Sequence, residues 1–521
     1  MRWKLPVLFI DPRLSRHAQM SGTLVPCSIF LVIGAYFWNI AIPATSAFYG
    51  ACILVYTMPV LAVLWSGAGL YIVRRAVSVS LSIIVPTAIL CVIDVIAMRA
   101  GVWHINEQTS TEIFPFPDLP LEELAFFLLV NTVIVFACCA IDRANAIIQM
   151  FPYIASTDPD VQLAMQNPFS IPYLVALLKC FAYPDYRLPS EPIEDLKVSL
   201  LVLFKASKSF NTASTAFSFN IRQDLGTLYG FCRMTDEIAD NESDSPDRQR
   251  KMDTLIEFVN DLFSAKEWGL VTVTPDYIDW AKYEHLPEED VACYRAVSRM
   301  AHFLPKKPFE ELIAGYQWDI SGQTVKTQDD LLKYCTFVAS SVGDLCTAVI
   351  MYRTGQGNWR LEQNRSEWIT HRAREMGQVL QLVNIARDIV TDSQTLGRCY
   401  VPVTYLTNPT QELELLKTGK ARHIRDGNLR TYALRILALA DKLSNSGSRG
   451  IDALPMEVRN GVRAACQVYS SIGIKIRTAQ GYPLRAHLNT WERGWVALRC
   501  LYGLHGQSTS TRSRMDIWKI Y

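Results

Sequence analysis

The sequence predicts an all-α protein in which an N-terminal transmembrane helical bundle of about four spans precedes a C-terminal all-α domain. Of the 521 residues, 50% are apolar and 19% are charged, whereas soluble domains are about 25% charged. The charges are also unevenly placed, because residues 1–150 carry only 16 of the 101 Asp, Glu, Lys and Arg side chains. After residue 194, apolar positions recur three or four residues apart, which is the period of amphipathic helices.

Four apolar segments are each long enough to cross a bilayer. A hydrocarbon core about 30 Å thick requires about 20 helical residues, and between Met20 and Asp94 the only charged side chains are Arg74 and Arg75. The expected spans are 23–42, 48–73, 77–98 and 121–141. The sequence therefore predicts an integral membrane protein with membrane lipid as a partner. A net charge of +1 without a single-sign block argues against a nucleic-acid partner.

The basic residues that flank these segments predict their orientation, because cytoplasmic loops retain Lys and Arg. Arg16 precedes the first span, Arg74 and Arg75 lie between the second and third, and Arg143 follows the fourth. The loop between the third and fourth spans is instead acidic. We expect the N-terminus and everything after Asp142, including the catalytic domain, to be cytosolic.

Three carboxylates lie at the ends of the predicted spans. Asp94 is near the end of the third span, and Glu122 and Glu123 open the fourth in the string PLEE. Ionisable groups at membrane depth are candidates for function, but acidic residues also stabilise helix N-termini. On the residues alone we favour the second interpretation, with Glu122 and Glu123 at the interface and Asp94 facing the headgroups.

Proline content predicts where the two halves join. Residues 152–192 contain seven prolines, too many for long helices. We expect a membrane domain over 1–145, a proline-rich linker over 146–193, a catalytic domain over 194–505 and a polar tail over 506–521. Within the linker, the apolar residues 171–183 are too few to span and are expected to lie against the membrane surface.

Two stripes of oxygen ligands carry the predicted chemistry. Asp236 and Asp240 are four residues apart in one helical segment, and Asn384, Asp388 and Asp392 follow the same spacing in another, so each set projects from one helix face. Mg²⁺ is held by carboxylates together with phosphate oxygens of a substrate. We expect the two stripes to bind Mg²⁺, with Mn²⁺ as the alternative, and a diphosphate between them.

Arginines and aromatic side chains accompany the stripes. Arg233, Arg387 and Arg222 are expected to neutralise phosphate charge. Phe210 and Tyr229 are candidates to line an apolar substrate cavity, although each aromatic residue in this region is more simply explained as core.

The second half resembles phytoene and squalene synthases. The resemblance rests on KSFNTASTAFSFNIRQDLGTLYGFCRMTDEIAD, LKYCTFVASSVGDLC and QLVNIARDIVTDSQTLGRCYVP, in that order. It implies the all-α isoprenoid synthase fold, with Asp236, Asp240, Asp388 and Asp392 binding Mg²⁺ and diphosphate. It also adds Ser209, Arg398 and Tyr400 as site residues. Asn211 departs from the family, which usually has Tyr there.

The first half is similar to the second part of the membrane lycopene cyclase portion found in fungal bifunctional lycopene cyclase/phytoene synthases. The strings MPVLAVLWS, IDVIAMRAGVWHIN and LPLEELAFFLLVNTVIVF carry this resemblance. That family has two three-helix repeats, each with a Pro-x-Glu-Glu type motif whose carboxylate protonates the polyene. Only one such motif occurs here, so Asp94, Glu122 and Glu123 are expected to be a remnant and the half to act mainly as an anchor.

The resemblance implies head-to-head condensation of two geranylgeranyl diphosphates to phytoene, through a cyclopropyl diphosphate and without NADPH. Three alternatives remain open. One is a related synthase with a different substrate or a squalene-like product, and another is retained cyclase activity. The last is a non-catalytic membrane scaffold that serves other carotenoid enzymes.

Overall fold

The computed structural model describes residues 5–165, 167–207, 210, 213–240, 245–267, 277–355, 363–483 and 486–503. Within these ranges the ordered elements are helices, as the sequence predicts, and the only β-pairing is one isolated bridge between Phe116 and Leu119. The chain divides into two compact units, Met1–Ile193 and Glu194–Tyr521. Ser209, Asn211 and the tail 506–521 lie outside the described residues.

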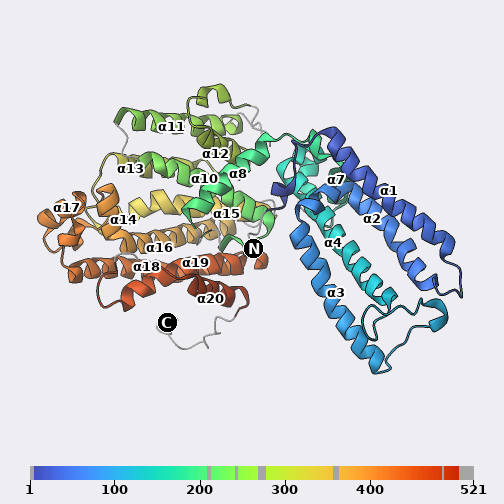
Figure 1. Cartoon of the computed structure of the whole chain (residues 1–521). Coiled ribbons are helices and arrows are strands. Elements are labelled where there is room, and N and C mark those ends of the chain that lie inside the picture. The colour runs from blue at the N-terminus through green and yellow to red at the C-terminus, as the bar shows by residue number, and fades with distance from the viewer. Residues whose placement is uncertain are drawn as a thin grey trace. The chain divides into compact units, whose positions relative to one another are not determined.

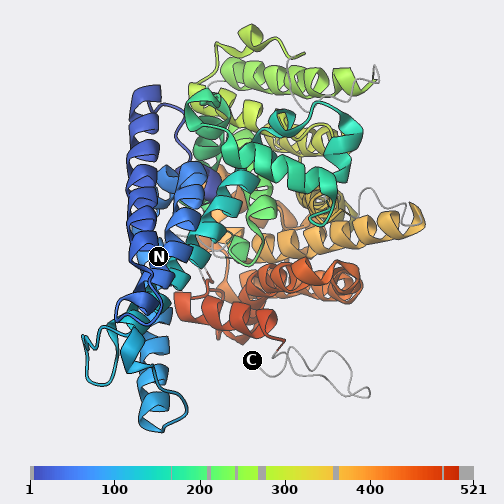
Figure 2. The same cartoon turned by 90° about the vertical axis from the view of Figure 1, so that its right-hand side faces the viewer.

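Unit 1 is built on four long apolar helices, which lie at the positions of the four expected spans. They are α1 (Arg16–Ile40), α2 (Phe48–Arg74), α3 (Ala76–Arg99) and α4 (Leu121–Met150). Figures 1 and 2 show α1 beside α2, and α3 beside α4. Pro26, Pro59 and Pro86 lie inside the first three helices, where neighbouring helices in a bilayer tolerate them. Length and composition would allow all four to cross a membrane.

The ends of these helices that carry arginine are joined by ion pairs. Arg74 lies 2.9 Å from Asp11, and Arg75 lies 2.8 Å from Asp142. Arg143 lies 2.6 Å from Asp185 with both side chains almost fully buried. The basic flanks of the spans are therefore gathered at one end of the bundle, which is the arrangement that the loop charges predict.

The proline-rich segment forms short helices that belong to unit 1: α5 (Pro152–Ala155), α6 (Pro159–Ala164) and α7 (Ile171–Ala182). Helix α7 packs on α4 and α2, and a Cβ at Gly67 would lie only 2.2 Å from the Phe181 ring. The opposite side of α7 exposes Ile171, Val175 and Leu178. An exposed apolar face of this kind suits the membrane interface.

Unit 2 is a layered assembly of helices (Figure 1). Its first half contains α8 (Glu191–Ala206, which begins at the end of unit 1), α10 (Phe219–Asp240), α11 (Ser245–Glu267), α12 (Glu288–Ser298) and α13 (Lys307–Ile320). Its second half contains α14 (Gln328–Cys335), a π-helical turn (Thr336–Ser340), α15 (Ser341–Arg353), α16 (Gln363–Leu396), α17 (Pro409–Lys417), α18 (Asp426–Ala453), α19 (Met456–Thr478) and α20 (Thr490–Leu501).

Helix α16 is the central element of the second half, where it packs against α15, α18 and α19. Glycine permits its close approach to the π-helical turn, because a Cβ at Gly377 would lie 2.4 Å from the Ala339 carbonyl oxygen. The continuous run Gln328–Arg353 is a fifth helix long and apolar enough to cross a membrane, but 50% of its most apolar window is buried inside the protein.

Candidate active site

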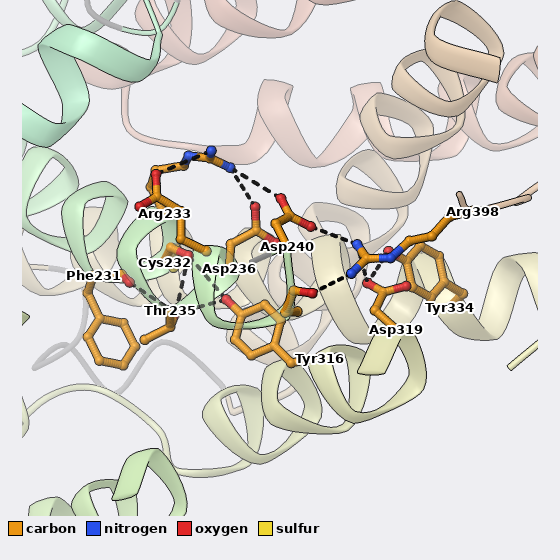
Figure 3. A network of polar contacts seen from close by, with 12 residues as sticks. Phe231, Cys232, Arg233, Thr235, Asp236, Asp240, Tyr316, Asp319, Tyr334 and Arg398 are labelled. Atoms are coloured by element: carbon orange, nitrogen blue, oxygen red, sulfur yellow. Dashed lines mark hydrogen bonds and ion pairs between the residues drawn. The ribbon is translucent and has the colours of Figure 1, made fainter. Parts of the chain in front are cut away.

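Helix α10 presents the first carboxylate stripe. Arg233 lies on the same face, with its Nη1 2.8 Å from Asp236 Oδ2 and 3.8 Å from Asp240 Oδ2 (Figure 3). Asp236 keeps 43% of its side chain exposed and Asp240 keeps 26%. The predicted pair of aspartates is therefore brought together with an arginine and remains open to a ligand.

The buried side of α10 fixes this stripe. Thr235 is fully buried, and its hydroxyl lies 2.9 Å from the hydroxyl of Tyr316 on α13. The Tyr316 hydroxyl also donates to the Cys232 carbonyl at 3.1 Å. Phe231 packs in the core against Phe309 with ring centroids 5.6 Å apart, so it is a core residue.

Arg398 joins α10 to a third carboxylate. Helix α16 ends at Leu396, and Gly397 adopts φ +61°, a left-handed conformation that commonly terminates helices. The reversed chain lets Arg398 Nη1 reach Asp240 Oδ1 at 2.7 Å and Asp319 Oδ2 at 3.9 Å. Its Nη2 donates to the Ala239 carbonyl. Figure 3 shows the guanidinium between Asp240 and Asp319.

Asp319 was not identified from the sequence. It lies on α13 with only 6% of its side chain exposed, and both of its oxygens accept phenol hydrogen bonds at 2.9 Å, from Tyr400 and Tyr334. The two phenol rings stack with centroids 4.8 Å apart. The only sequence signal is one acidic residue in an otherwise apolar stretch, directly after Trp318.

Helix α16 presents the second stripe. Arg387 Nε donates to Asp388 Oδ1 at 2.9 Å, so the arginine and the aspartate form a pair. The hydroxyl of buried Tyr482 accepts from the Ile389 N–H at 3.1 Å and lies 2.8 Å from the Arg387 carbonyl. Tyr482 therefore fixes the backbone under Asp388, a role that its sequence context does not reveal.

The carboxylates of the two stripes affect the pKa values of one another. Burial and the neighbouring Asp240 raise the pKa of Asp236 to about 7, although Arg233 opposes the effect. Burial, then Asp388, raise the pKa of Asp392 to about 8, with Asp240 of the other stripe contributing. Burial likewise raises the pKa of Asp319 to about 6. This excess of negative charge disfavours full ionisation and would be relieved by bound cations.

The ligand set fits a hard divalent cation. The stripes offer only oxygen atoms, which Mg²⁺ prefers, and the buried Oδ1 of Asn384 has no hydrogen-bond partner in the described structure. Across the described residues, His, Cys, Asp and Glu form no group of three or more that could hold a metal by itself. The residues therefore fit Mg²⁺ that takes part of its ligands from substrate phosphates.

The remaining predicted residues occupy varied environments. Arg222 is buried, its Nε lies 3.3 Å from Ser214 Oγ, and burial lowers its pKa. Phe210 and Tyr229 stack with centroids 5.0 Å apart, so these two aromatic candidates do come together. The Tyr400 hydroxyl donates a hydrogen bond to Asp319, as described above.

In unit 1, the three acidic candidates also come together. Asp94 is 2% exposed and accepts a hydrogen bond from Trp103 Nε1 at 3.0 Å, so the expectation that it faces the headgroups is wrong. Glu122 is 3% exposed and accepts from the N–H and hydroxyl of Thr111 at 2.6 and 2.7 Å. Tyr49 donates to Glu123 at 2.9 Å.

Comparison with known proteins identifies the family of this chain. The model of the squalene/phytoene synthase family matches residues 203–492. The bifunctional lycopene cyclase/phytoene synthase of Blakeslea trispora is 44% identical over 97% of this chain and 81% of its own length. That of Phycomyces blakesleeanus is 46% identical over 96% and 81%. A solved dehydrosqualene synthase matches with 20% identity and a TM-score of 0.46, over 60% of this chain and 98% of that one. The chain belongs to the family of bifunctional lycopene cyclase/phytoene synthases, with a squalene/phytoene synthase domain over residues 203–492.

Proposed function

We propose that this chain is a prenyl transferase that condenses two molecules of geranylgeranyl diphosphate head to head into phytoene and releases diphosphate. The observation that carries the proposal is the pair of carboxylate stripes on α10 and α16, accompanied by Arg233, Arg387 and Arg398. This combination suits two anionic substrates better than a single acidic helix face would. The membership of the family agrees with it.

The carboxylates Asp236, Asp240, Asp388 and Asp392, together with Asn384, would hold Mg²⁺. The bound cations supply positive charge that stabilises the departing diphosphate. The arginines that now pair with Asp236 and Asp388 would turn toward phosphate oxygens, since a guanidinium binds phosphate as well as carboxylate. Arg398 keeps Asp240 in place from the side of Asp319.

The aromatic side chains serve the later steps. The allylic cation attacks the 2,3-double bond of the second substrate and leaves a tertiary cation. Loss of a proton from C1 of the first substrate, with the released diphosphate as the available base, closes the cyclopropane ring. The cyclopropyl diphosphate that results must ionise in a dry cavity. The stacked rings of Phe210 and Tyr229 offer a negative π-face to such a cation. Water is excluded because quenching would end the reaction before phytoene forms.

The test uses the full-length protein in detergent with geranylgeranyl diphosphate and Mg²⁺, without NADPH. We expect phytoene and diphosphate, and no product when chelator removes the metal. Asp236→Asn and Asp388→Asn should each abolish turnover. Asp441→Asn is the matched control, because Asp441 is an exposed aspartate paired with Arg477 at 2.8 Å. If the protein forms no product from geranylgeranyl diphosphate or from a shorter prenyl diphosphate, the proposal is overturned.

A second candidate function is lycopene cyclisation by unit 1. The observation that favours it is the burial of Asp94 and Glu122 beside Glu123, which a purely anchoring bundle does not need. Buried carboxylates are costly in hydrocarbon and are usually functional. Formation of a cyclic carotene from lycopene by the full-length protein would support this function, and recovery of unchanged lycopene would refute it.

We also propose that the four helices α1 to α4 span a membrane, with the N-terminus and unit 2 in the cytosol. The proposal rests on the arginine-rich ends of the helices. An epitope inserted after Glu112 should be protected from protease in sealed cytosol-out vesicles, whereas an epitope at the C-terminus should be cleaved. The reverse pattern would overturn the orientation.

A further inference from the structure

Three acidic residues from two helices meet at one end of the bundle in unit 1. Asp94 lies in the last turns of α3, and Glu122 and Glu123 lie in the first turn of α4. Tyr49, at the start of α2, binds Glu123. Asp94 and Glu122 both act electrostatically on Glu123. This group, Asp94 with Glu122 and Glu123, is called the carboxylate cluster below.

Cations do not neutralise the carboxylate cluster in the described part of the chain. The charged groups that act on Glu123 are Asp94 and Glu122, and Arg99, the nearest arginine along α3, pairs instead with the exposed Asp118 at 2.7 Å. Three unneutralised carboxylates cannot all ionise in a medium of low polarity, because like charges at short range disfavour one another. At least one carboxyl must therefore keep its proton.

The hydrogen bonds distinguish the members of the cluster. Glu122 Oε1 accepts from two Thr111 donors, at 2.6 and 2.7 Å, and donors of this kind stabilise an ionised carboxylate. Glu123 accepts from the Tyr49 phenol. Asp94 has one donor, Trp103 Nε1, on its Oδ1. Asp94 Oδ2 and Glu122 Oε2 are both buried and have no hydrogen-bond partner in the described structure, so these two carboxyls differ in their number of donors, one for Asp94 and two for Glu122.

From this asymmetry we infer that Asp94 is the proton donor of the cyclisation site and that Glu122 is the carboxylate that faces the cation and accepts the proton at the end. The inference rests on the proposed cyclase function of unit 1. An acid that protonates an unactivated double bond must be poorly stabilised as an anion. Asp94 has a single neutral hydrogen-bond donor, whereas Glu122 has two donors on one oxygen. The PLEE string alone would have assigned the acid to Glu122 or Glu123.

The step balances without an oxidant or a reductant. The proton leaves Asp94 Oδ2 and forms a C–H bond with the terminal double bond of an acyclic polyene, which gives a tertiary cation. The neighbouring internal double bond attacks that cation and closes a six-membered ring. Glu122 removes a ring proton, and the electrons of that C–H bond form the ring double bond. One proton enters and one leaves, so the product is an isomer, and transfer from Glu122 to Asp94 restores the site.

Access to Asp94 would be from the lipid. The side chains of Val92, Ile93 and Ile96 around it on α3 are 60%, 53% and 62% exposed, so they form an apolar surface along which a polyene can lie. The Trp103 indole that covers Asp94 is itself 47% exposed. Displacement of this indole would open Asp94 to the polyene end.

The first experiment measures the proton directly. Infrared spectra of the full-length protein in lipid nanodiscs are recorded with Mg²⁺ at about pH 9, where Asp236, Asp319 and Asp392 of unit 2 are ionised. They should contain the carbonyl stretch of a buried protonated carboxylic acid, and the band should shift in heavy water. We expect Asp94→Asn to remove this band and Glu122→Gln to leave it. The control is Asp118→Asn, an exposed aspartate at the same end of the bundle, which should also leave it. Loss of the band in Glu122→Gln or Glu123→Gln instead would overturn the assignment.

The second experiment separates this inference from the function on which it rests. With lycopene supplied, Asp94→Asn should lower cyclisation by about 10²- to 10⁴-fold, the usual contribution of a general acid, and Asp94→Glu should restore part of it. Protease protection of the epitope after Glu112 reports that unit 1 of each variant is inserted like that of the wild type, and phytoene formation reports that unit 2 is intact. If the wild type does not cyclise lycopene, the cyclase function is refuted. If the wild type does but Asp94→Asn is equally active, only the role of Asp94 is refuted.

Discussion

Asp392 provides a direct test of the proposed metal site. When chelator has removed Mg²⁺, the Asp392 carboxylate should destabilise the folded protein, although turnover requires this carboxylate. Burial, then Asp388, raise its pKa to about 8 from an ordinary value of 3.8. A folded state that binds the proton more tightly than the unfolded state loses stability as pH rises between the two values. Asn at this position stays neutral, so Asp392→Asn should be more stable than the wild type, by a margin that grows from about pH 4 to pH 8.

The size of the effect follows from the two pKa values. A tenfold change in proton affinity is worth about 1.4 kcal/mol, so the cost of the ionised carboxylate above pH 8 is at most about 6 kcal/mol. Asp392 is only partly buried, and solvent screens charges at such positions. We therefore expect about 1 to 2 kcal/mol, which corresponds to a rise in Tm of roughly 3 °C.

The assay is thermal unfolding of the full-length protein in detergent and chelator, from pH 5 to pH 9, followed by addition of Mg²⁺. The Tm difference between Asp392→Asn and the wild type should increase up to about pH 8 and then stay level. Mg²⁺ should stabilise the wild type more than the variant, because ligands that bind only the folded state raise its stability. Asp441→Asn serves as the surface control. A variant that is less stable than the wild type at pH 8, or a difference independent of pH, would refute the reasoning.

Three further changes test other contacts. Arg398→Gln removes the link between Asp240 and Asp319 and should lower kcat for phytoene by roughly 10²-fold, as loss of one oriented donor does; a kcat within threefold of the wild type would contradict it. Tyr482→Phe removes the hydroxyl that binds the α16 backbone and should cost about 1 to 2 kcal/mol of stability, measured as a lower Tm at unchanged Mg²⁺. Arg143→Leu leaves Asp185 buried without its main partner and should cost about 3 to 5 kcal/mol; the double variant Arg143→Leu/Asp185→Leu should recover part of that loss, and failure to recover would indicate a role for the charges beyond pairing.

The helices of both units can be predicted because the sequence patterns that indicate them involve residues close together in the chain. Gaps between charged residues mark α2 and α3 to within one residue, since a bilayer sets the length of an apolar helix. Helix α1 begins seven residues before its expected span, and α4 continues nine residues beyond its expected end. The i and i+4 spacing of Asp236 and Asp240 is enough to assign both carboxylates to one helix face. These features depend on residues that are neighbours along one helix.

Contacts between segments that are distant in the sequence cannot be predicted from charge gaps or helical spacing. Asp319 reaches the site only because α13 packs beside α10 and because Gly397 turns Arg398 back toward them. The position of Asp94 near the end of its helix suggests exposure to the headgroups, but Trp103, from the following loop, covers it. Both residues act through partners that sequence spacing does not bring together.

The apolar run Gln328–Arg353 also has a consequence for how the protein is made. It resembles a membrane span in length and mean hydropathy, and it leaves the ribosome before α16, the helix that covers it. During that interval the insertion machinery meets a segment that it could transfer into the bilayer. Asp344 lies inside it and Arg353 at its end, and a charge near the centre of a span costs about 3 kcal/mol on insertion. Replacing both by Leu should therefore divert part of the newly made chain into the membrane with the wrong topology, even though neither residue belongs to the stripes.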